Sequence, residues 1–328
     1  IRVNGVIFTN PKRQHQRRSQ RPASPKPASS PNVESRVYWP LLDGRRQALI
    51  IPMSTLTQNA TEKTPHSAPL IDIGANLTHE SFAADFTAVL SRAQLAGVNQ
   101  ILVTGASLQG SIDALALAQQ QPGYLWATAG IHPHHADEAD PAALAQLRTL
   151  AAQPEIKAIG ETGLDFFRDI CPRHQQVHAF EAHIELAIET GLPMFLHERE
   201  SSQAFLEVLR PYRDQLSQVV VHCFTGEAAA LYHYLDLDCH IGITGWICDE
   251  RRGAHLIPLV SDIPENRLLI ETDAPYLLPR NIKPKPKGRR NEPVHLPYVC
   301  QAVATATGKS YADIARTTTT NAREFFRL

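Results

Sequence analysis

The chain has 328 residues, of which 43% are hydrophobic and 20% are charged, and its formal net charge at pH 7 is −1. These values are typical of a soluble globular protein with a large core, and they exclude a wholly disordered chain. No apolar stretch approaches the roughly 18 uninterrupted residues of a membrane helix, which excludes a membrane-spanning protein. The five cysteines form no C-x-x-C pair, so we expect reduced thiols in a cytoplasmic protein.

The first segment of the chain differs from the rest. Residues 1–52 carry ten Lys or Arg against two acidic residues, with many Pro and Ser, a composition that does not fold alone. We therefore expect 1–66 to be a disordered or non-native extension, with the natural start at Met53, the first methionine. The alternative, an Arg-rich transit peptide, lacks a clear amphipathic helix. The folded domain is expected over 67–328, and subtracting +8 for residues 1–52 from −1 leaves −9 for 53–328.

From residue 70 onward, short apolar runs alternate with longer segments of helical periodicity. The runs are LIDIGAN, QILVTG, LWATAGIHP, KAIGETGLD, PMFLHERE, QVVVHCFTG, HIGITGW and LLIETDAPYL. Their continuous hydrophobicity predicts parallel strands that are covered on both faces. Eight strand–helix units over residues 69–328 match the roughly 250 residues of a (β/α)8 TIM barrel, an α/β fold. A doubly wound sheet is the alternative, but IDIGANLT lacks the G-x-G-x-x-G spacing that its first loop needs.

Polar residues end several of these runs, at the carboxyl ends of the predicted strands, where such a barrel builds its active site. Two imidazoles and a carboxylate form a normal ligand set for a divalent cation, and Glu161, His197 and His222 supply that set. Asp273 adds a carboxylate that we expect to orient and deprotonate a water held by the metal, or to complete the metal site. Glu161 and Asp273 are therefore also our candidate catalytic residues.

The other histidines are interpreted by their position. His132 and His134, in GIHPH, follow the third run and lie on the same rim. We expect them to contact a substrate phosphate or to brace a metal ligand, with the capping of a turn as the alternative. His178 and His183 lie on helical segments far from the strand ends, so we expect them at the surface.

A basic segment follows the eighth run. Residues 279–297, PRNIKPKPKGRRNEPVHLP, hold six Lys or Arg and one acidic residue in an otherwise acidic domain. We expect Arg289 and Arg290 to bind phosphates of a polynucleotide, with a solvated surface as the alternative. Tyr276 and Trp246 lie near strand ends, where they would either stack on bases or pack against the rim.

Six motifs, AIGETGLD, FLHERE, VVHCFTG, IGITGW, IETDAPYL and RRNEPVHLP, together resemble the TatD-type hydrolases of the metal-dependent hydrolase superfamily. DIGANLT and GWICDERRG resemble the branch from which the family takes its name. The resemblance implies a cytoplasmic 3′–5′ exonuclease for single-stranded DNA and RNA, in DNA repair or turnover. It implies Mg²⁺ as the usual cation, with Mn²⁺ or Zn²⁺ as alternatives. It also implies Glu161, His197 and His222 as metal ligands and Asp273 as a catalytic or further metal-binding carboxylate. We expect a monomer.

The chain departs from the wider family in its first run, where most members carry an H-x-H pair for a second metal. Gly74 and Asn76 occupy the matching positions, so we expect one firmly bound cation. We expect Asn76 to act in substrate binding instead, by hydrogen bonding to a metal-bound water or to Asp273. Two other functions stay open: an aminoacyl-tRNA deacylase or other metal-dependent ester or amide hydrolase, and a binding scaffold without catalysis.

Overall fold

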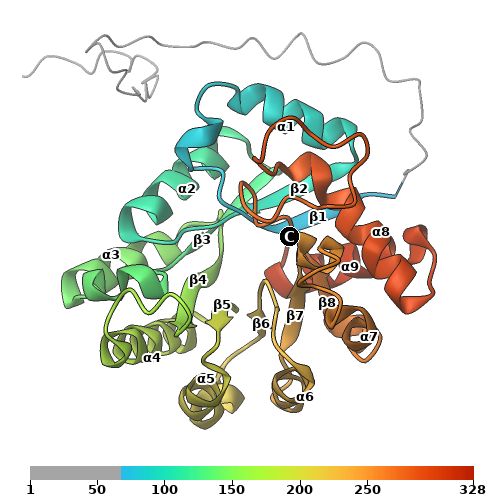
Figure 1. The fold of residues 1–328 in the computed structure, drawn as a ribbon. Helices are drawn as coiled ribbons and strands as arrows, with labels where there is room; N and C mark the ends of the chain where they lie inside the picture. The colour runs from blue at the N-terminus through green and yellow to red at the C-terminus, as the bar shows by residue number, and fades with distance from the viewer. Residues whose placement is uncertain (1–67) are drawn as a thin grey trace, which may run out of the picture. The chain divides into compact units, whose positions relative to one another are not determined.

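The computed structural model describes residues 68–328, so the expected extension 1–66 and Met53 lie outside the described residues. The described chain forms an eight-stranded sheet in the order β1 to β8, and each neighbouring pair is parallel. Figure 1 shows the strands around a common axis with helices outside them. The strands are β1 (Leu70–Ala75), β2 (Val98–Val103), β3 (Leu125–Ala129), β4 (Ile156–Asp165), β5 (Met194–Arg199), β6 (Val219–Val221), β7 (His240–Ile243) and β8 (Leu268–Ile270).

The sheet closes where β1 meets the residues that follow β8. Ala75 forms a parallel bridge with Ala274, and the Asn76 N–H donates to the Ala274 carbonyl oxygen at 2.7 Å. The Asp273 N–H donates to the Gly74 carbonyl oxygen at 2.8 Å. The predicted (β/α)8 barrel is confirmed, and its closure holds Asn76 beside Asp273.

Helices cover the outside of the barrel. Ser107 Oγ accepts the Gly110 N–H at 3.0 Å where α2 begins, and Gly191 ends α4 in the left-handed conformation, with a φ of 66°, which glycine adopts without steric cost. None of the helices in 68–328 is long and apolar enough to cross a membrane. The α-helices are α1 (Phe86–Leu95), α2 (Leu108–Gln120), α3 (Pro141–Ala151), α4 (Arg173–Thr190), α5 (Ser202–Leu209), α6 (Ala228–Asp236), α7 (Leu256–Val260), α8 (Leu296–Thr307) and α9 (Tyr311–Phe326).

Apolar side chains close one end of the barrel. Ile71 and Phe195 from the strands pack in one buried cluster with Phe325 of α9. Thr319, also on α9, donates its hydroxyl to the Pro69 carbonyl oxygen at 2.7 Å, directly before β1. Because α9 covers the amino-terminal ends of the strands, the polar chemistry of the barrel is confined to the carboxyl-terminal end.

Asp72 of β1 is a buried carboxylate that contacts Thr272, the residue after Glu271. Its oxygens lie 2.9 Å from the Thr272 backbone nitrogen and 2.5 Å from Thr272 Oγ1. Burial raises the pKa of Asp72 to about 8, because the hydrogen bonds from Thr272 offset only part of the lost hydration. The folded protein therefore keeps a proton there at neutral pH, whereas the unfolded chain releases it near the ordinary pKa of about 4.

We expect Asp72→Asn to gain stability relative to the wild type as pH rises from about 4 to about 8. In this window wild-type unfolding releases a proton, so its free energy of unfolding falls with rising pH, and the neutral amide removes that dependence. Urea denaturation of both proteins at several pH values across the window measures the difference. An identical pH dependence of the two proteins would show that Asp72 is already ionised in the fold.

Candidate active site

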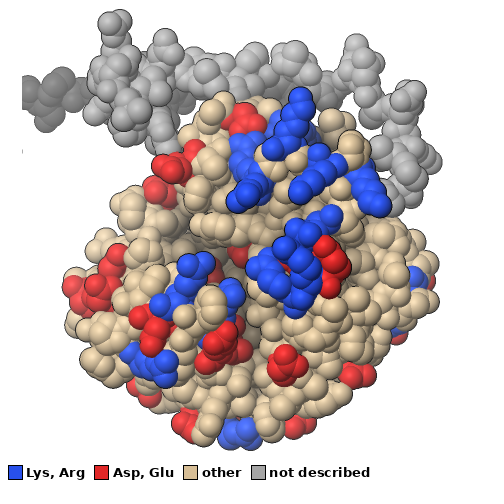
Figure 2. All heavy atoms as spheres, in the orientation of Figure 1, with Lys and Arg blue, Asp and Glu red and all other residues tan. Residues whose placement is uncertain are grey.

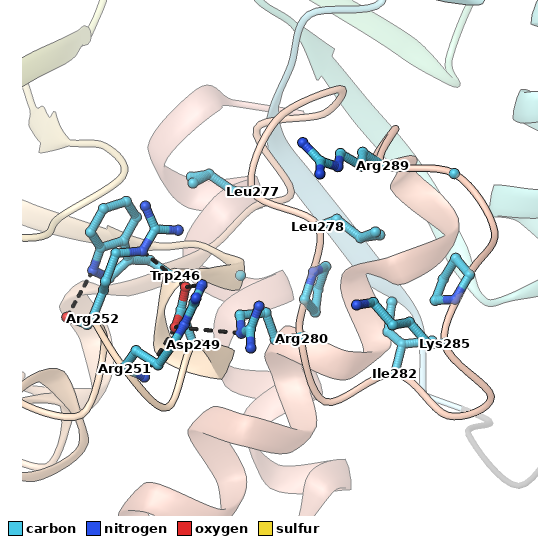
Figure 3. A pocket seen from close by; sticks show the side chains of 14 residues that line it. Trp246, Asp249, Arg251, Arg252, Leu277, Leu278, Arg280, Ile282, Lys285 and Arg289 are labelled. Atoms are coloured by element: carbon cyan, nitrogen blue, oxygen red, sulfur yellow. Dashed lines mark hydrogen bonds and ion pairs between the residues drawn. The ribbon is translucent and has the colours of Figure 1, made fainter.

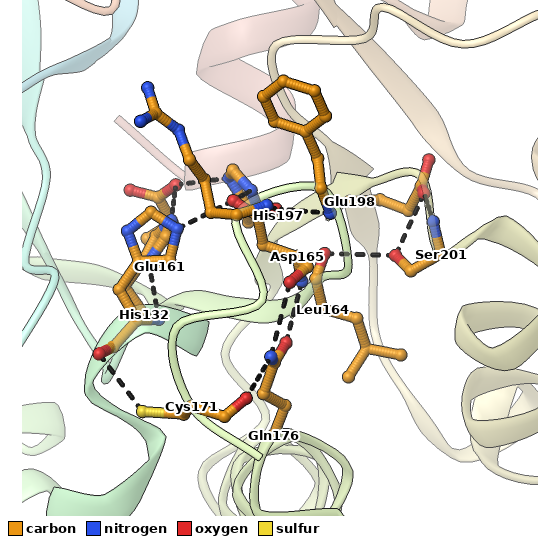
Figure 4. Close-up of polar contacts among 12 residues, drawn as sticks. His132, Glu161, Leu164, Asp165, Cys171, Gln176, His197, Glu198 and Ser201 are labelled. Carbon is orange, nitrogen blue, oxygen red and sulfur yellow. Dashed lines mark hydrogen bonds and ion pairs between the residues drawn. The ribbon is translucent and has the colours of Figure 1, made fainter. Parts of the chain in front are cut away.

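The predicted polar residues converge at the carboxyl-terminal end of the barrel. They come from six different strands or the loops after them, and they surround one cavity of about 840 Å³. Figure 4 shows three of them together, His132, Glu161 and His197, with their polar contacts. The residues of this catalytic cavity that sequence reasoning had singled out are Asn76, His132, His134, Glu161, His197, His222, Trp246, Asp273 and Tyr276.

Glu161 lies at the centre of this group. Its Oε1 atom is 2.8 Å from His222 Nε2, 3.0 Å from His197 Nδ1 and 3.4 Å from His132 Nε2. Burial alone would raise the pKa of Glu161, but the imidazoles of His222, His132 and His197 outweigh burial and lower that pKa well below its ordinary value. One ionised carboxylate thus holds three imidazoles from three other strands or loops.

Two glycines bring β4 against β5 around Glu161. Gly160 and Gly163 have φ values of 142° and 137°. A Cβ atom at Gly160 would lie 2.1 Å from the Phe195 carbonyl oxygen, and one at Gly163 would lie 2.0 Å from that of His197. Only glycine permits both this backbone conformation and this close approach. The GETG motif therefore places Glu161 within reach of the imidazole on the neighbouring strand.

His197 and His222 each lie between two carboxylates. His197 contacts Glu161 through Nδ1, and its Nε2 is 3.4 Å from Asp165 Oδ2. His222 contacts Glu161 through Nε2, and its Nδ1 is 3.4 Å from Glu271 Oε2. Burial would lower the pKa of both imidazoles, but these carboxylates outweigh it and raise both pKa values. Metal-binding histidines commonly have such a carboxylate at the ring nitrogen opposite the metal.

Sequence reasoning missed Asp165 and Glu271. The fourth run, KAIGETGLD, ends at Asp165 as β4 does, but Glu161 alone was chosen from it as a site residue. Alternate residues of a strand share a face, so the even separation of Asp165 from Glu161 was a signal that could have found it. Glu271 precedes Asp273 by two residues in IETDAPYL, directly after the end of β8 at Ile270.

His132 has a different hydrogen-bonding pattern. Its Nδ1 accepts the His134 backbone N–H at 3.1 Å, so the neutral ring carries its proton on Nε2, facing Glu161. A protonated nitrogen cannot bind a metal. By distance alone, His132, Glu161 and His197 offer ligand atoms that all lie within 4.8 Å of one another. The tautomer nevertheless favours Glu161, His197 and His222 as ligands, and it leaves His132 as a donor toward substrate.

His134 braces the site from the same loop. Its Nε2 lies 2.7 Å from Asp165 Oδ2, and the same carboxylate also faces His197. The Asp165 Oδ1 atom also accepts the Arg168 N–H at 2.8 Å. These contacts fix the carboxylate that orients His197, which matches the bracing role considered for His134.

The surface position expected for His183 is wrong. This residue of α4 is fully buried, its Nε2 accepts the Ile131 N–H at 3.0 Å, and its Nδ1 donates to the Ala179 carbonyl oxygen at 2.7 Å. Because Ile131 directly precedes His132, His183 fixes the backbone of the loop that presents His132. His178 is exposed, as expected.

Asp273 and Asn76 form a pair at the seam of the barrel. Asn76 Nδ2 donates to Asp273 Oδ1 at 2.9 Å, which is one of the two contacts expected for Asn76. Burial raises the pKa of Asp273 to about 7, and the negative charges of Glu161 and Glu271 contribute, while His222 opposes the rise. A carboxylate with a pKa near neutrality is suited to accept a proton at physiological pH.

The structure has no room for a histidine side chain at position 74. A Cβ atom at Gly74 would lie 2.5 Å from Glu271 Oε2 and 2.9 Å from Phe195 Cζ. Glu271 therefore fills the space that an imidazole at position 74 would need. Its other oxygen accepts the Cys223 N–H at 2.6 Å, which holds it in place. The missing side chain at position 74 is thus matched by Glu271, and the binding of a single firm cation stays a prediction.

The basic segment after β8 gives Arg290 a role other than the one expected. Its guanidinium donates to both Asp85 oxygens, at 2.8 and 2.9 Å, and to Glu292 Oε1 at 2.6 Å. These bonds tie the segment to the residues before α1 and occupy the donors that a phosphate would need. We therefore remove Arg290 from the substrate-binding candidates. Arg289 is exposed and forms no ion pair within 68–328, so it stays a candidate.

Aromatic side chains stand at the mouth of the catalytic cavity. Tyr276 and Phe167 both line it and are 52% and 50% exposed. Trp246 lies beneath Arg252, whose guanidinium carbon is 4.3 Å from the ring centroid. Exposed rings beside a phosphate site can stack on bases. Sequence reasoning missed Phe167, which lies two residues beyond the end of the KAIGETGLD run.

The residues present fit a divalent cation. In the described part of the chain, His197 Nε2 is buried without a well-formed hydrogen bond, since Asp165 lies 3.4 Å away. A buried polar atom without a hydrogen-bond partner is accounted for by an ion or an ordered water in the working site, and the imidazole and carboxylate donors around it are those that divalent cations take. Imidazoles and carboxylates at the carboxyl-terminal end of a closed (β/α)8 barrel define a barrel of the metal-dependent hydrolase class.

Comparison with known proteins assigns the family. The family described as TatD related DNase matches residues 71–327, and the chain belongs to it. The 3′-5′ ssDNA/RNA exonuclease TatD of Erwinia billingiae is 50% identical over 259 residues, which cover 79% of this chain and 99% of that protein. The protein of the same name from Yersinia pseudotuberculosis is 48% identical, over 79% of this chain and 100% of its own. The expected family is confirmed.

Solved structures agree with this assignment. YjjV, a TatD homolog from Escherichia coli K12, has a TM-score of 0.72 at 26% identity and covers 79% of this chain and 98% of its own. A TatD family hydrolase from Entamoeba histolytica has a TM-score of 0.71 at 25% identity, with the same coverage of 79% and 98%. The barrel described above is thus the fold of its family.

We expect a divalent cation to raise the thermal unfolding midpoint of the wild type. A ligand that binds only the folded state stabilises it by about 2.7 kcal/mol at a hundred times its Kd. His222→Ala should lose this shift, because a neutral His222 can direct its Nδ1–H to Glu271 and leave Nε2 for the metal. His132→Ala should keep most of it, because the His134 N–H on Nδ1 keeps the His132 proton on Nε2. Thermal unfolding during titration with Mg²⁺, Mn²⁺ and Zn²⁺ measures the shift, with the exposed His178→Ala as control. The opposite ranking of the two variants would assign His132 as the ligand.

Proposed function

We propose that the protein is a metal-dependent 3′–5′ exonuclease that hydrolyses phosphodiester bonds in single-stranded DNA and RNA. The observation that carries the proposal is the Glu161, His197 and His222 centre, which faces Asp273 across an open cavity. The relatives near 50% identity that bear the name of such an exonuclease support the substrate class and the direction.

In this proposal Glu161, His197 and His222 hold the cation. When bound, a divalent cation activates water and offsets negative charge on a phosphoryl oxygen. Asp273 accepts the proton of the attacking water, and Asn76 orients that carboxylate through its bond to Oδ1. His132 donates from Nε2 to a phosphate oxygen as negative charge builds on it.

The cation and the assembly complete the proposal. Several carboxylates close together favour Mg²⁺, whereas the imidazoles also suit Mn²⁺ and Zn²⁺, so we take Mg²⁺ as the working cation and the other two as comparisons. One chain supplies all the side chains that line the site, so a single copy suffices for the proposed chemistry, and we propose a monomer.

A single-stranded oligonucleotide labelled at its 5′ end tests the activity. With Mg²⁺ we expect a ladder of products that shortens from the 3′ end, and no products in EDTA or with a blocked 3′ end. D-aminoacyl-tRNA is incubated in parallel, because the same residues could direct water at an ester. Release of the amino acid with an intact oligonucleotide would replace the nuclease with an ester hydrolase. No reaction with either substrate would favour a binding scaffold.

We expect Asp273→Asn to lower kcat for the oligonucleotide by about 10²- to 10⁴-fold, the range for loss of a general base. Asn76→Ala should lower kcat by only about tenfold, because it loosens the carboxylate without removing it. Single-turnover assays at saturating Mg²⁺ measure both effects. If metal still raises the unfolding midpoint of Asp273→Asn, the loss of activity is a loss of proton transfer rather than of metal binding. A wild-type kcat in Asp273→Asn would refute Asp273 as the general base.

A further inference from the structure

A second cavity, the basic pocket, adjoins the catalytic cavity. It has a volume of about 640 Å³ and lies between the loop after β7 and the segment after β8 (Figure 3). Its wall shares Trp246, Arg252 and Leu277 with the catalytic cavity. The two cavities therefore form one continuous depression on the carboxyl-terminal face.

Positive charge dominates the basic pocket. Five cationic side chains line it against one carboxylate, that of Asp249. Figure 2 shows Lys and Arg gathered on one side of this face. The rest of the folded domain is net negative, so the concentration is local. The cationic residues are Arg251, Arg252, Arg280, Lys285 and Arg289.

One wall of the basic pocket is held in place before any ligand arrives. The Asp249 side chain is only 3% exposed and lies 2.9 Å from Arg252 Nε, 3.4 Å from Arg251 Nε and 3.5 Å from Arg280 Nε. Arg252 also lies over the ring of Trp246. Arg280 is also paired with Glu250 at 2.7 Å, so the net positive charge of this wall comes from Arg251 and Arg252, which share the Asp249 carboxylate. Groups held in a binding conformation lose less entropy when a ligand binds.

The opposite wall carries uncommitted charge. Lys285 and Arg289 are exposed, and neither forms an ion pair within the described part of the chain. The neighbouring Arg290, by contrast, has its donors on Asp85 and Glu292. Exposed cations without a partner, beside a fixed cluster of arginines, fit a ligand that brings several negative charges at regular spacing.

We propose that the basic pocket binds the phosphodiester backbone of a single-stranded polynucleotide whose end lies in the catalytic cavity. This inference rests on the proposed function and deepens it. The pocket offers guanidinium and ammonium donors, which bind phosphates without reading the bases. It therefore adds affinity for longer strands of any sequence, and it places the strand so that its end reaches Glu161 and Asp273.

The salt dependence of binding tests the proposal with Lys285→Ala combined with Arg289→Ala. Fluorescence anisotropy with a labelled oligonucleotide in EDTA, which prevents cleavage, gives the slope of log K against log salt concentration. Each phosphate contact contributes about −0.7 to this slope for single strands. We therefore expect the double variant to have a slope smaller by about 1.4, with a loss of affinity that shrinks for a trinucleotide.

The matched control is Arg316→Ala combined with Arg323→Ala, two exposed arginines of α9 at the closed end of the barrel. It removes the same charge and should leave the slope unchanged. A wild-type slope in the pocket variant, or an equal loss in the control, would overturn the pocket. Cleavage of the oligonucleotide with no change of slope refutes the pocket alone. A reduced slope without any cleavage keeps the pocket and refutes the proposed activity.

Discussion

The buried carboxylate of Glu161, surrounded by imidazoles, is the interaction on which the site depends. An ionised carboxylate is stable away from water only if charged or hydrogen-bonding partners replace its hydration. Three histidines supply those partners from β5, from the end of β6 and from the loop after β3. Asp165 and Glu271 in turn face His197 and His222. The barrel end is therefore a network of alternating carboxylates and imidazoles that a divalent cation can complete.

This network requires close approach of the backbone at two places. The glycines beside Glu161 allow β4 to touch β5, and the seam between β1 and the residues after β8 brings Asn76 to Asp273. Gly74 belongs to the same seam, where the absence of a side chain leaves room for Glu271. The strand geometry and the chemistry of the site are thus consequences of the same few positions.

Electrostatics then relates the site to its substrate class. Four carboxylates at one barrel end, those of Glu161, Asp165, Glu271 and Asp273, would repel a polyanion. A bound cation offsets part of that repulsion, and the cationic side chains of the basic pocket offset it further along the same depression. Two neighbouring arginines of the segment after β8 have different roles. Arg290 binds Asp85 and so holds the segment in place, whereas Arg289 is exposed.

The sequence by itself determined the barrel, the strand ends and most of the polar residues around the cavity, because hydrophobic periodicity is a local property and parallel strands all direct their carboxyl ends to one face. Only the tertiary structure decided which partner each side chain takes. Glu271 meets Gly74, His183 meets Ile131 and Arg290 meets Asp85 across long separations in the chain. Such pairings depend on distances of a few ångströms between elements that no local pattern encodes. For that reason His183 was misplaced, the ion pairs of Arg290 were not foreseen, and Asp165 and Glu271 were missed.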